Sequence, residues 1–235
     1  MFYIVKLKTE FIIPAVTVLL IVLTILFFGD PQTAFVASIN GSNCLVIDPG
    51  HGGIDGGAIS LAGDKESEIN LAIALKLRAI AQLFGESTLM TRENEEPRTD
   101  AGTYSEREEL IYRTSIANSV PNAVLISIHQ NCYPTSQPSG GQVLYASNEE
   151  SELFGRITHQ NIIRFLQPEN RRVAEPASEG LYITSNSKCP TILIECGFMS
   201  NLSDVEKLKD NDYQTALSAV LFASYAQYRY QAAMA

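Results

Sequence analysis

Residues 44–53 read CLVIDPGHGG, and this stretch decides the fold class. Its first part, Cys44–Ile47, is a compact apolar run rich in β-branched residues, which is typical of a buried strand. Asp48-Pro49-Gly50 ends the run, and more glycines follow. Because glycine has no Cβ atom, these positions allow backbone turns and the close approach of a substrate. The stretch therefore predicts a buried strand that ends in a tight, open turn.

Outward from this strand, short apolar runs alternate with longer helical patterns. The predicted strands are Cys44–Ile47, Ser87–Thr91, Ala123–Ile128, Gly141–Ala146 and Thr191–Cys196. The predicted helices are Glu66–Phe84, Ser105–Asn118, Glu149–Leu166, Ser203–Leu208 and Asp212–Gln231, with capping-box spacing from Ser105 to Glu108 and from Ser203 to Glu206. This alternation predicts one α/β domain with a largely parallel sheet that helices cover on both faces.

The N-terminal segment Phe11–Phe28 contains eighteen residues without a charge. At about 1.5 Å per residue, a helix of this length nearly crosses the roughly 30 Å hydrocarbon layer of a membrane. Lys6 and Lys8 precede the segment and Asp30 follows it, so the charge bias places the N-terminus in the cytoplasm. We therefore predict one N-terminal transmembrane helix. A cleaved signal peptide, cut near residues 36–38, is the alternative.

These features predict three regions. Residues 1–30 form the cytoplasmic N-terminus and the membrane anchor or signal peptide, residues 31–41 form a linker, and residues 42–235 form the exported folded domain. The expected location is a single-pass membrane protein whose folded domain lies outside the cytoplasm. With the signal-peptide alternative, the domain is secreted.

Composition excludes some classes of partner and site. The net charge of −9, without a run of Lys or Arg, argues against a nucleic-acid partner. The four cysteines form no CxxC pair, which argues against a thiolate zinc site. Cys132 and Cys196 could form a disulfide outside the cell, but cysteines in apolar runs usually behave as small buried side chains.

Four reactive side chains interrupt the apolar pattern. His51, His129 and Glu195 lie at the carboxyl ends of predicted strands, where open α/β sheets assemble their sites, and Glu66 begins the first long helix. Two imidazoles with one carboxylate form a ligand set of the kind that catalytic zinc uses, and the second carboxylate could transfer protons. The residues alone leave open which of Glu66 and Glu195 binds the metal and which transfers protons. Glu195 follows an apolar run, and a carboxylate in such surroundings needs a metal, a partner or a raised pKa.

Other reactive groups carry weaker signals. His159 lies within a predicted helix, and we expect it to face solvent. Residues 93–109 are acidic and read as a solvated loop and helix start, not as a site. GxSxG and the P-loop lysine are absent, which argues against a serine hydrolase and a nucleotide-binding loop. Cys132 follows His129 closely, but nothing in the sequence orders the two as a nucleophile and its base.

Five motifs in order resemble the zinc-dependent N-acetylmuramoyl-L-alanine amidases of bacterial cell-wall metabolism. They are VIDPGHGG at 46–53, Lys65-Glu66 with Asn70-Leu71, Thr91-Arg92, SIHxN at 127–131 and ExGFxSN at 195–201. The resemblance implies that His51, Glu66 and His129 bind one zinc ion and that Glu195 is the catalytic carboxylate. It also implies a twisted, mostly parallel sheet of about six strands. The implied reaction is hydrolysis of the amide between the lactyl group of N-acetylmuramic acid and L-alanine in peptidoglycan.

The layout is most similar to the sporulation branch of this family, which implies a role in spore-cortex maturation and germination. Asp55, Asn131 and Arg92 are candidates for supporting or substrate-contacting roles. Only Cys132–Gly140 separates the SIHxN motif from the next predicted strand, which leaves no room for the helical plug of larger relatives. Wall-binding repeats are also absent, so we expect the anchor or a partner protein to hold the domain near the wall. The alternatives are a non-catalytic wall-binding protein and a zinc hydrolase of another peptide amide.

Overall fold

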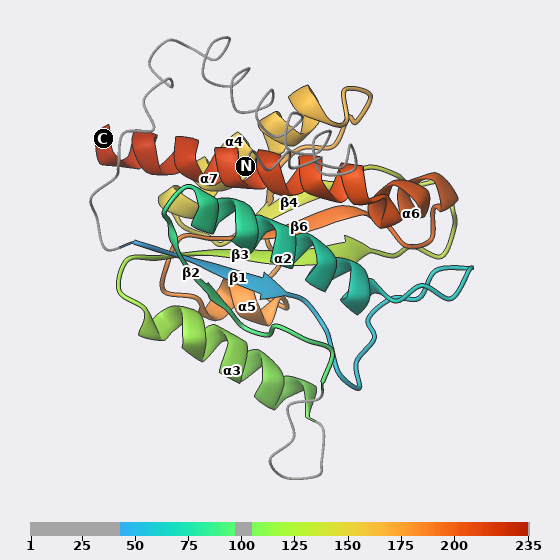
Figure 1. Ribbon diagram of the computed structural model, residues 1–235, viewed down its shortest axis with the longest axis horizontal. Coiled ribbons are helices and arrows are strands. Elements are labelled where there is room, and N and C mark those ends of the chain that lie inside the picture. The colour runs from blue at the N-terminus through green and yellow to red at the C-terminus, as the bar shows by residue number, and fades with distance from the viewer. Residues whose placement is uncertain (1–42, 97–104, 235) are drawn as a thin grey trace, which may run out of the picture.

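The computed structural model describes residues 43–96 and 105–234, and it contains a six-stranded sheet with helices on both sides (Figure 1). The strands are β1 Cys44–Pro49, β2 Ser87–Met90, β3 Ala123–Asn131, β4 Gln142–Tyr145, β5 Glu175–Pro176 and β6 Thr191–Phe198. The helices are α2 Glu66–Leu83, α3 Glu106–Ser119, α4 Glu149–Phe165, α5 Tyr182–Asn186, α6 Leu202–Lys209 and α7 Asn211–Met234.

The sheet is mixed, in the order β2-β1-β3-β6-β4-β5. β1 pairs in parallel with β2 and β3, and β3 pairs in parallel with β6. β4 runs antiparallel to β6 and carries the two-residue strand β5 at its outer edge. The last strand of the sequence therefore lies inside the sheet, between β3 and β4.

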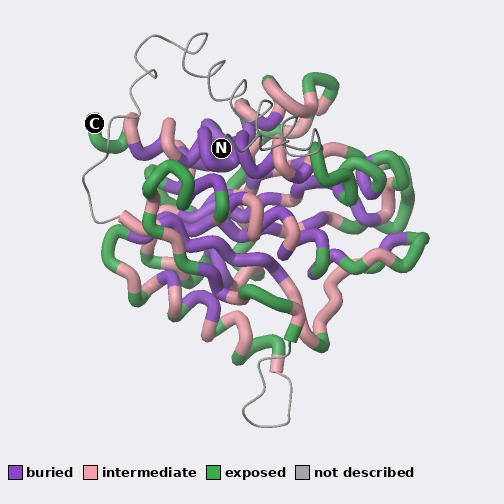
Figure 2. The backbone as a smooth tube through the Cα atoms, in the orientation of Figure 1, coloured by how far each residue is buried: buried purple, intermediate pink, exposed green. Residues whose placement is uncertain are grey.

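The two faces of the sheet are covered unequally. α2, α4 and α7 cover one face, and α3 with the short α5 covers the other (Figure 1). Alternate residues of a strand point to opposite faces, so Leu45 and Ile47 enter the large core under α2 and α7, whereas Val46 enters the small core under α3 and α5. The inner strands β1, β3 and β6 are almost entirely buried, whereas the edge strands β2 and β5 are largely exposed (Figure 2).

The same alternation determines where the polar side chains of the strands go. In β1, Asp48 has the parity of Val46, and in β6, Glu195 has the parity of Leu193. Both therefore point toward the thinner layer of α3 and α5. Because fewer apolar side chains fill that layer near the carboxyl ends of β1, β3 and β6, a cavity can form there.

The predicted fold class needs a correction in its membrane part. Within residues 43–96 and 105–234, no helix is long and apolar enough to cross a membrane. The segment Phe11–Phe28, on which the prediction of a transmembrane helix depended, lies outside these described residues. Over the residues that the structure describes, the fold is a mixed six-stranded α/β sheet with helices on both faces.

One local prediction needs correction, and the disulfide alternative for Cys132 and Cys196 is not realised. The helix at Leu202–Lys209 begins after Asn201, whose side chain accepts a hydrogen bond from the backbone N–H of Asp204, so the predicted cap at Ser203 is wrong. Cys132 and Cys196 form no disulfide, since all four cysteines are free. Ser105, by contrast, caps α3 as predicted by accepting a bond from the backbone N–H of Glu108.

Candidate metal centre

The turn after β1 brings His51 over the carboxyl end of the sheet. Gly50 continues the strand pairing by donating its N–H to the carbonyl of Ile128 at 2.9 Å. His51 then adopts φ of 59°, in the left-handed region that residues with a side chain rarely occupy. A Cβ atom on Gly50 would lie 2.2 Å from the His129 ring, so only glycine permits this approach of the turn to β3.

Asp55 orients the ring of His51. Its Oδ2 lies 2.7 Å from His51 Nδ1, and its Oδ1 accepts the backbone N–H of Gly57 at 3.0 Å. A carboxylate on one ring nitrogen fixes the ring and leaves the other nitrogen free to act as a ligand. That other nitrogen, Nε2, lies 3.3 Å from Glu66 Oε1.

Glu66 is the first residue of α2, and it is 2% exposed. Its Oε2 accepts the N–H of Ala58 at 2.9 Å, and its Oε1 accepts the N–H of Gln130 at 2.9 Å. These bonds and the nearby imidazoles outweigh the cost of burying the charge, so the pKa of Glu66 lies well below its usual range. The residue is therefore a fixed, buried carboxylate.

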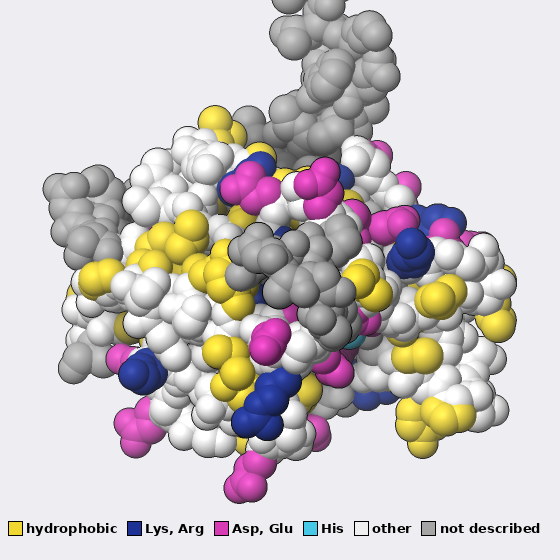
Figure 3. Space-filling view, turned by 90° about the horizontal axis from the view of Figure 1, so that it is seen from below, with side chains coloured by type: hydrophobic (Ala, Val, Ile, Leu, Met, Phe, Trp, Pro, Cys, Tyr) yellow, Lys and Arg dark blue, Asp and Glu magenta, His cyan; other side chains and the backbone are white. Residues whose placement is uncertain are grey.

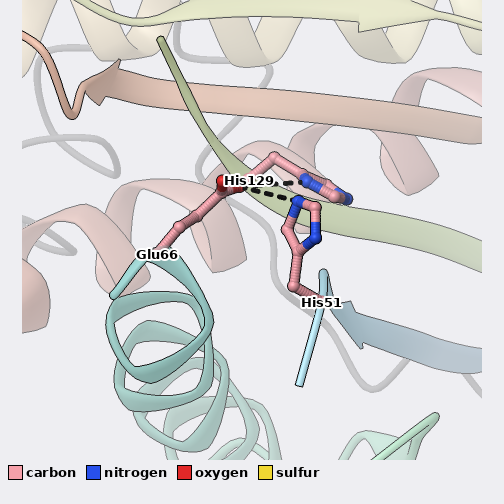
Figure 4. Close-up of side chains that lie close together, drawn as sticks. All are labelled: His51, Glu66 and His129. Carbon is pink, nitrogen blue, oxygen red and sulfur yellow. Dashed lines mark hydrogen bonds and ion pairs between the residues drawn. The ribbon is translucent and has the colours of Figure 1, made fainter. Parts of the chain in front are cut away.

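His51, Glu66 and His129 converge on one point (Figure 4). One ligand atom from each lies within 4.8 Å of the others, and Glu66 Oε1 is 3.2 Å from His129 Nδ1. The two imidazole rings meet edge to face, with centroids 4.9 Å apart. Burial opposes protonation of His51, yet the carboxylates of Glu66 and Asp55 raise its pKa to about 9, which shows that the local field favours a cation.

Glu195 lies beside this group in the sheet, because it is the direct register partner of His129. Its Oε2 is buried without a hydrogen-bond partner among the described residues. Burial raises the pKa of Glu195 to about 7, partly against the attraction of His129. An unsatisfied buried carboxylate is costly, so its place next to two imidazoles and a second carboxylate suits the binding of a cation or a substrate group.

These side chains line a cavity of about 320 Å³ on the α3 and α5 side of the sheet. Its walls include the N-terminal part of α3 and the segment before and within α5, lined by Glu106, Glu109, Leu110, Leu181, Tyr182 and Ile183. In the space-filling view of this side, histidine is visible next to acidic side chains (Figure 3). The prediction that residues 93–109 contribute nothing to a site is therefore wrong for Glu106 and Glu109.

The three supporting candidates differ in position. Asp55 lines the cavity and contacts His51 directly. Arg92 lies outside the lining and donates to the carbonyls of Pro49 and Gly50, so it holds the turn. Asn131 also lies outside the lining, and its carbonyl accepts the N–H of Met199 at 2.7 Å.

The expectation for His159 is wrong. Its side chain is 4% exposed rather than solvent-facing, and Nε2 lies 2.7 Å from the carbonyl of Arg172. The ring packs within α4, away from the three converging side chains. It is a buried structural histidine.

The family model for N-acetylmuramoyl-L-alanine amidase (Amidase_3) matches residues 45–224, which is most of the chain. The chain belongs to this amidase family. It is therefore an N-acetylmuramoyl-L-alanine amidase, an enzyme whose substrate is peptidoglycan. The match spans every strand of the sheet except the first residue of β1, and it contains all four site residues.

Among curated amidases, the chain is similar to the germination-specific N-acetylmuramoyl-L-alanine amidase of Bacillus subtilis. The two are 32% identical over 197 residues, which cover 78% of each protein. The chain is also 29% identical to the sporulation-specific amidase of the same organism, over 74% of this chain and 63% of that protein.

Among solved structures, the fold is similar to the CwlD amidase from Clostridioides difficile, which was determined in complex with the GerS lipoprotein. The TM-score is 0.75 at 28% identity, over 79% of this chain and 98% of that chain. The catalytic domain of the amidase CwlV from Bacillus (Paenibacillus) polymyxa gives a TM-score of 0.68 at 25% identity, over 80% and 98% of the two chains.

Proposed function

We propose that this amidase depends on zinc, that His51, Glu66 and His129 hold one zinc ion, and that Glu195 is its catalytic acid and base. The convergence of the three ligand atoms within 4.8 Å carries the proposal. Two imidazole nitrogens and one carboxylate oxygen suit catalytic zinc, which takes three protein ligands and keeps a further position open. The hydrogen bond between His51 Nδ1 and the carboxylate of Asp55 orients the ring, as a histidine ligand requires.

A bound zinc ion supplies Lewis acidity, which polarises a carbonyl group and makes water more acidic. The protein contributes the proton transfer. Glu195 is the direct neighbour of His129 in the sheet, and a carboxyl whose pKa lies at about 7 can both accept and donate a proton at neutral pH. Glu195 takes the proton of the attacking water and passes it to the departing L-alanine nitrogen.

The metal proposal is tested by measuring zinc in the purified full-length chain and in His129→Ala. We expect one zinc per unsubstituted chain and almost none in the variant, because two ligands bind zinc far more weakly than three. His159→Gln is the matched control, since it removes the buried histidine that lies outside the group. Full zinc content in His129→Ala would contradict the ligand assignment.

The bond that is cut is tested by digesting purified peptidoglycan and analysing the fragments by mass spectrometry. Stem peptides with a free N-terminal L-alanine are the expected product. Cleaved glycan strands or cleaved crosslinks would point to another bond and thus to the alternative of a different hydrolase. Binding to peptidoglycan without cleavage would instead support a non-catalytic wall-binding protein.

We further propose a role in spore-cortex maturation, with residues 42–235 acting as the catalytic domain outside the cytoplasmic membrane. Similarity to the germination-specific and sporulation-specific amidases supports this role. The solved relative that carries a bound lipoprotein supports a partner that tethers or activates the domain. Spores of a deletion strain should retain cortex strands with intact stem peptides. A normal cortex in that strain would contradict the role.

A further inference from the structure

Arg113 lies under the metal centre and reaches the backbone of the turn that carries His51. Its side chain projects from α3, is 4% exposed and lines the cavity floor. Nη1 donates to the carbonyl of Pro49 at 2.7 Å, and Nη2 donates to the carbonyl of His51 at 2.6 Å. A helix on one side of the sheet thus holds the loop at the end of β1.

Two carboxylates fix the guanidinium itself. Asp48 accepts from Nη1 at 3.2 Å, and Glu109, one turn earlier on α3, accepts from Nε at 3.0 Å. Asp48 is in turn held by the hydroxyls of Thr91 and Ser127, each at 2.6 Å. With Glu109 on Nε, and with Asp48 and the carbonyl of Pro49 on Nη1, the planar fork of Arg113 holds Nη2 against the carbonyl of His51.

The other side-chain donors to this turn bind carbonyls one and two residues before His51. Arg92 donates to the carbonyls of Pro49 and Gly50, and Asn70 donates to the carbonyl of Gly50. The carbonyl of His51 accepts instead from Arg113, which also donates to the carbonyl of Pro49. His51 needs such a contact because its φ of 59° lies in a region that is energetically unfavourable for a residue with a side chain.

We infer that Arg113 is a positioning residue that keeps the backbone of His51 in the left-handed conformation from which its ring meets Glu66 and His129. The inference rests on the proposed function, since it takes His51 to be a ligand. Arg113 does not contact the reacting atoms. It acts through His51. It also holds Glu109 in the cavity wall, so the buried guanidinium of Arg113 sets the distance between that wall and His51.

Arg113→Lys tests the inference, because a single ammonium group cannot bond to Asp48, Pro49 and His51 in the geometry of a planar fork. The control is Thr91→Val, which removes another partner of Asp48 without touching the turn. Both are measured in the full-length chain, by hydrogen exchange of residues 50–57 without metal and by zinc affinity in competition with a chelator. We expect faster exchange in Arg113→Lys and zinc affinity lower by about 10–100-fold. Thr91→Val should match the unsubstituted chain in both.

Unchanged exchange of residues 50–57 in a folded Arg113→Lys would overturn the inference, as would an equal change in Thr91→Val. If the unsubstituted chain takes up no zinc, the proposed function fails, while the exchange measurement still decides whether Arg113 holds the turn. If Arg113→Lys does not fold, Asp48→Asn with Arg113→Gln replaces the charged pair by a neutral one. That double variant should still exchange faster than Asp48→Asn alone, and equal rates would overturn the inference.

Discussion

β6 separates two cavities, and they differ in how fully their buried polar groups are hydrogen-bonded. Glu195 points into the cavity of about 320 Å³ that contains His51 and His129. Its neighbour Cys196 points to the opposite face and lines a larger cavity of about 520 Å³, together with Gln167 and Tyr213. If volume alone marked a reactive site, the second cavity would be the better candidate.

The polar groups of the larger cavity bond to one another. Gln167 accepts the N–H of Gly141 at 2.7 Å and donates to the hydroxyl of Tyr213 at 2.8 Å, and Asn170 donates to the carbonyl of Gly141 at 2.8 Å. Burial raises the pKa of Tyr213 to about 12, so this network is neutral at physiological pH. Charged side chains such as Arg172, Asp204 and Lys207 also line the larger cavity, but the smaller cavity holds an oxygen of Glu195 that is buried without a hydrogen-bond partner among the described residues. Unsatisfied charge and backbone strain, rather than size, therefore identify the reactive side.

The largest expected difference between the two sides is in turnover. Glu195→Gln keeps the shape of the side chain but cannot accept a proton, so we expect peptide release from peptidoglycan to fall by roughly 10²–10⁴-fold. Zinc content should not change. The control is Cys196→Ala on the opposite face of the same strand, which should cost about 1 kcal/mol of unfolding free energy and leave turnover intact. Equal losses of turnover in the two variants would contradict the proposed division of roles.

A smaller difference is expected in how the unfolding free energy depends on pH. Burial raises the pKa of Asp48, but Arg113 and the hydroxyls of Ser127 and Thr91 outweigh burial and hold it below its ordinary value. The ionised form therefore stabilises the folded state above pH of about 4, and this contribution is lost as pH falls through the lowered folded pKa. Asp48→Asn should lower the unfolding free energy at pH 7 by about 3–5 kcal/mol and remove this part of the pH dependence.

Chemical denaturation at several pH values between neutral and acid measures this contribution. The control is Gln167→Met in the larger cavity, which changes no charge and should leave the acid dependence unchanged. An identical pH dependence in Asp48→Asn and in the unsubstituted chain would contradict the role of the charged network.

The smallest expected effect lies in the larger cavity. Tyr213→Phe removes one neutral hydrogen bond to Gln167, which still has the carbonyl of Cys196 at 3.3 Å as a partner. The unfolding free energy should fall by about 1 kcal/mol, with turnover unchanged. A tenfold loss of turnover in a fully folded Tyr213→Phe would show that the second cavity takes part in the reaction.

Much of the fold follows from sequence patterns, because hydrophobic periodicity marks long buried elements well. The predicted strand Thr191–Cys196 and helix Glu66–Phe84 agree closely with β6 and α2. β5 and α5 escaped prediction because they are two and five residues long and carry no periodic pattern. The antiparallel direction of β4 also leaves no local signal, since it depends on which strand β4 meets.

The site was predictable in part. The convergence of His51, Glu66 and His129 agrees with the motifs, because the carboxyl ends of parallel strands meet at one edge of the sheet. Arg113 was missed because an arginine on an otherwise polar helix looks like a surface residue. Its spacing of four from Glu109 was the available signal. The walls from α5 could not be foreseen, since they depend on tertiary packing.

The internal position of β6 has a consequence for synthesis of the chain. β4 ends at Tyr145, but its neighbour in the sheet is not made until residues 191–198 leave the ribosome. A nascent chain up to that point already has His51, Glu66 and His129, yet it lacks the strand that joins the two halves of the sheet and brings Glu195 beside them. Truncation between the end of β3 and the start of β6 therefore leaves a polypeptide with three of the four reactive groups and no complete hydrolase.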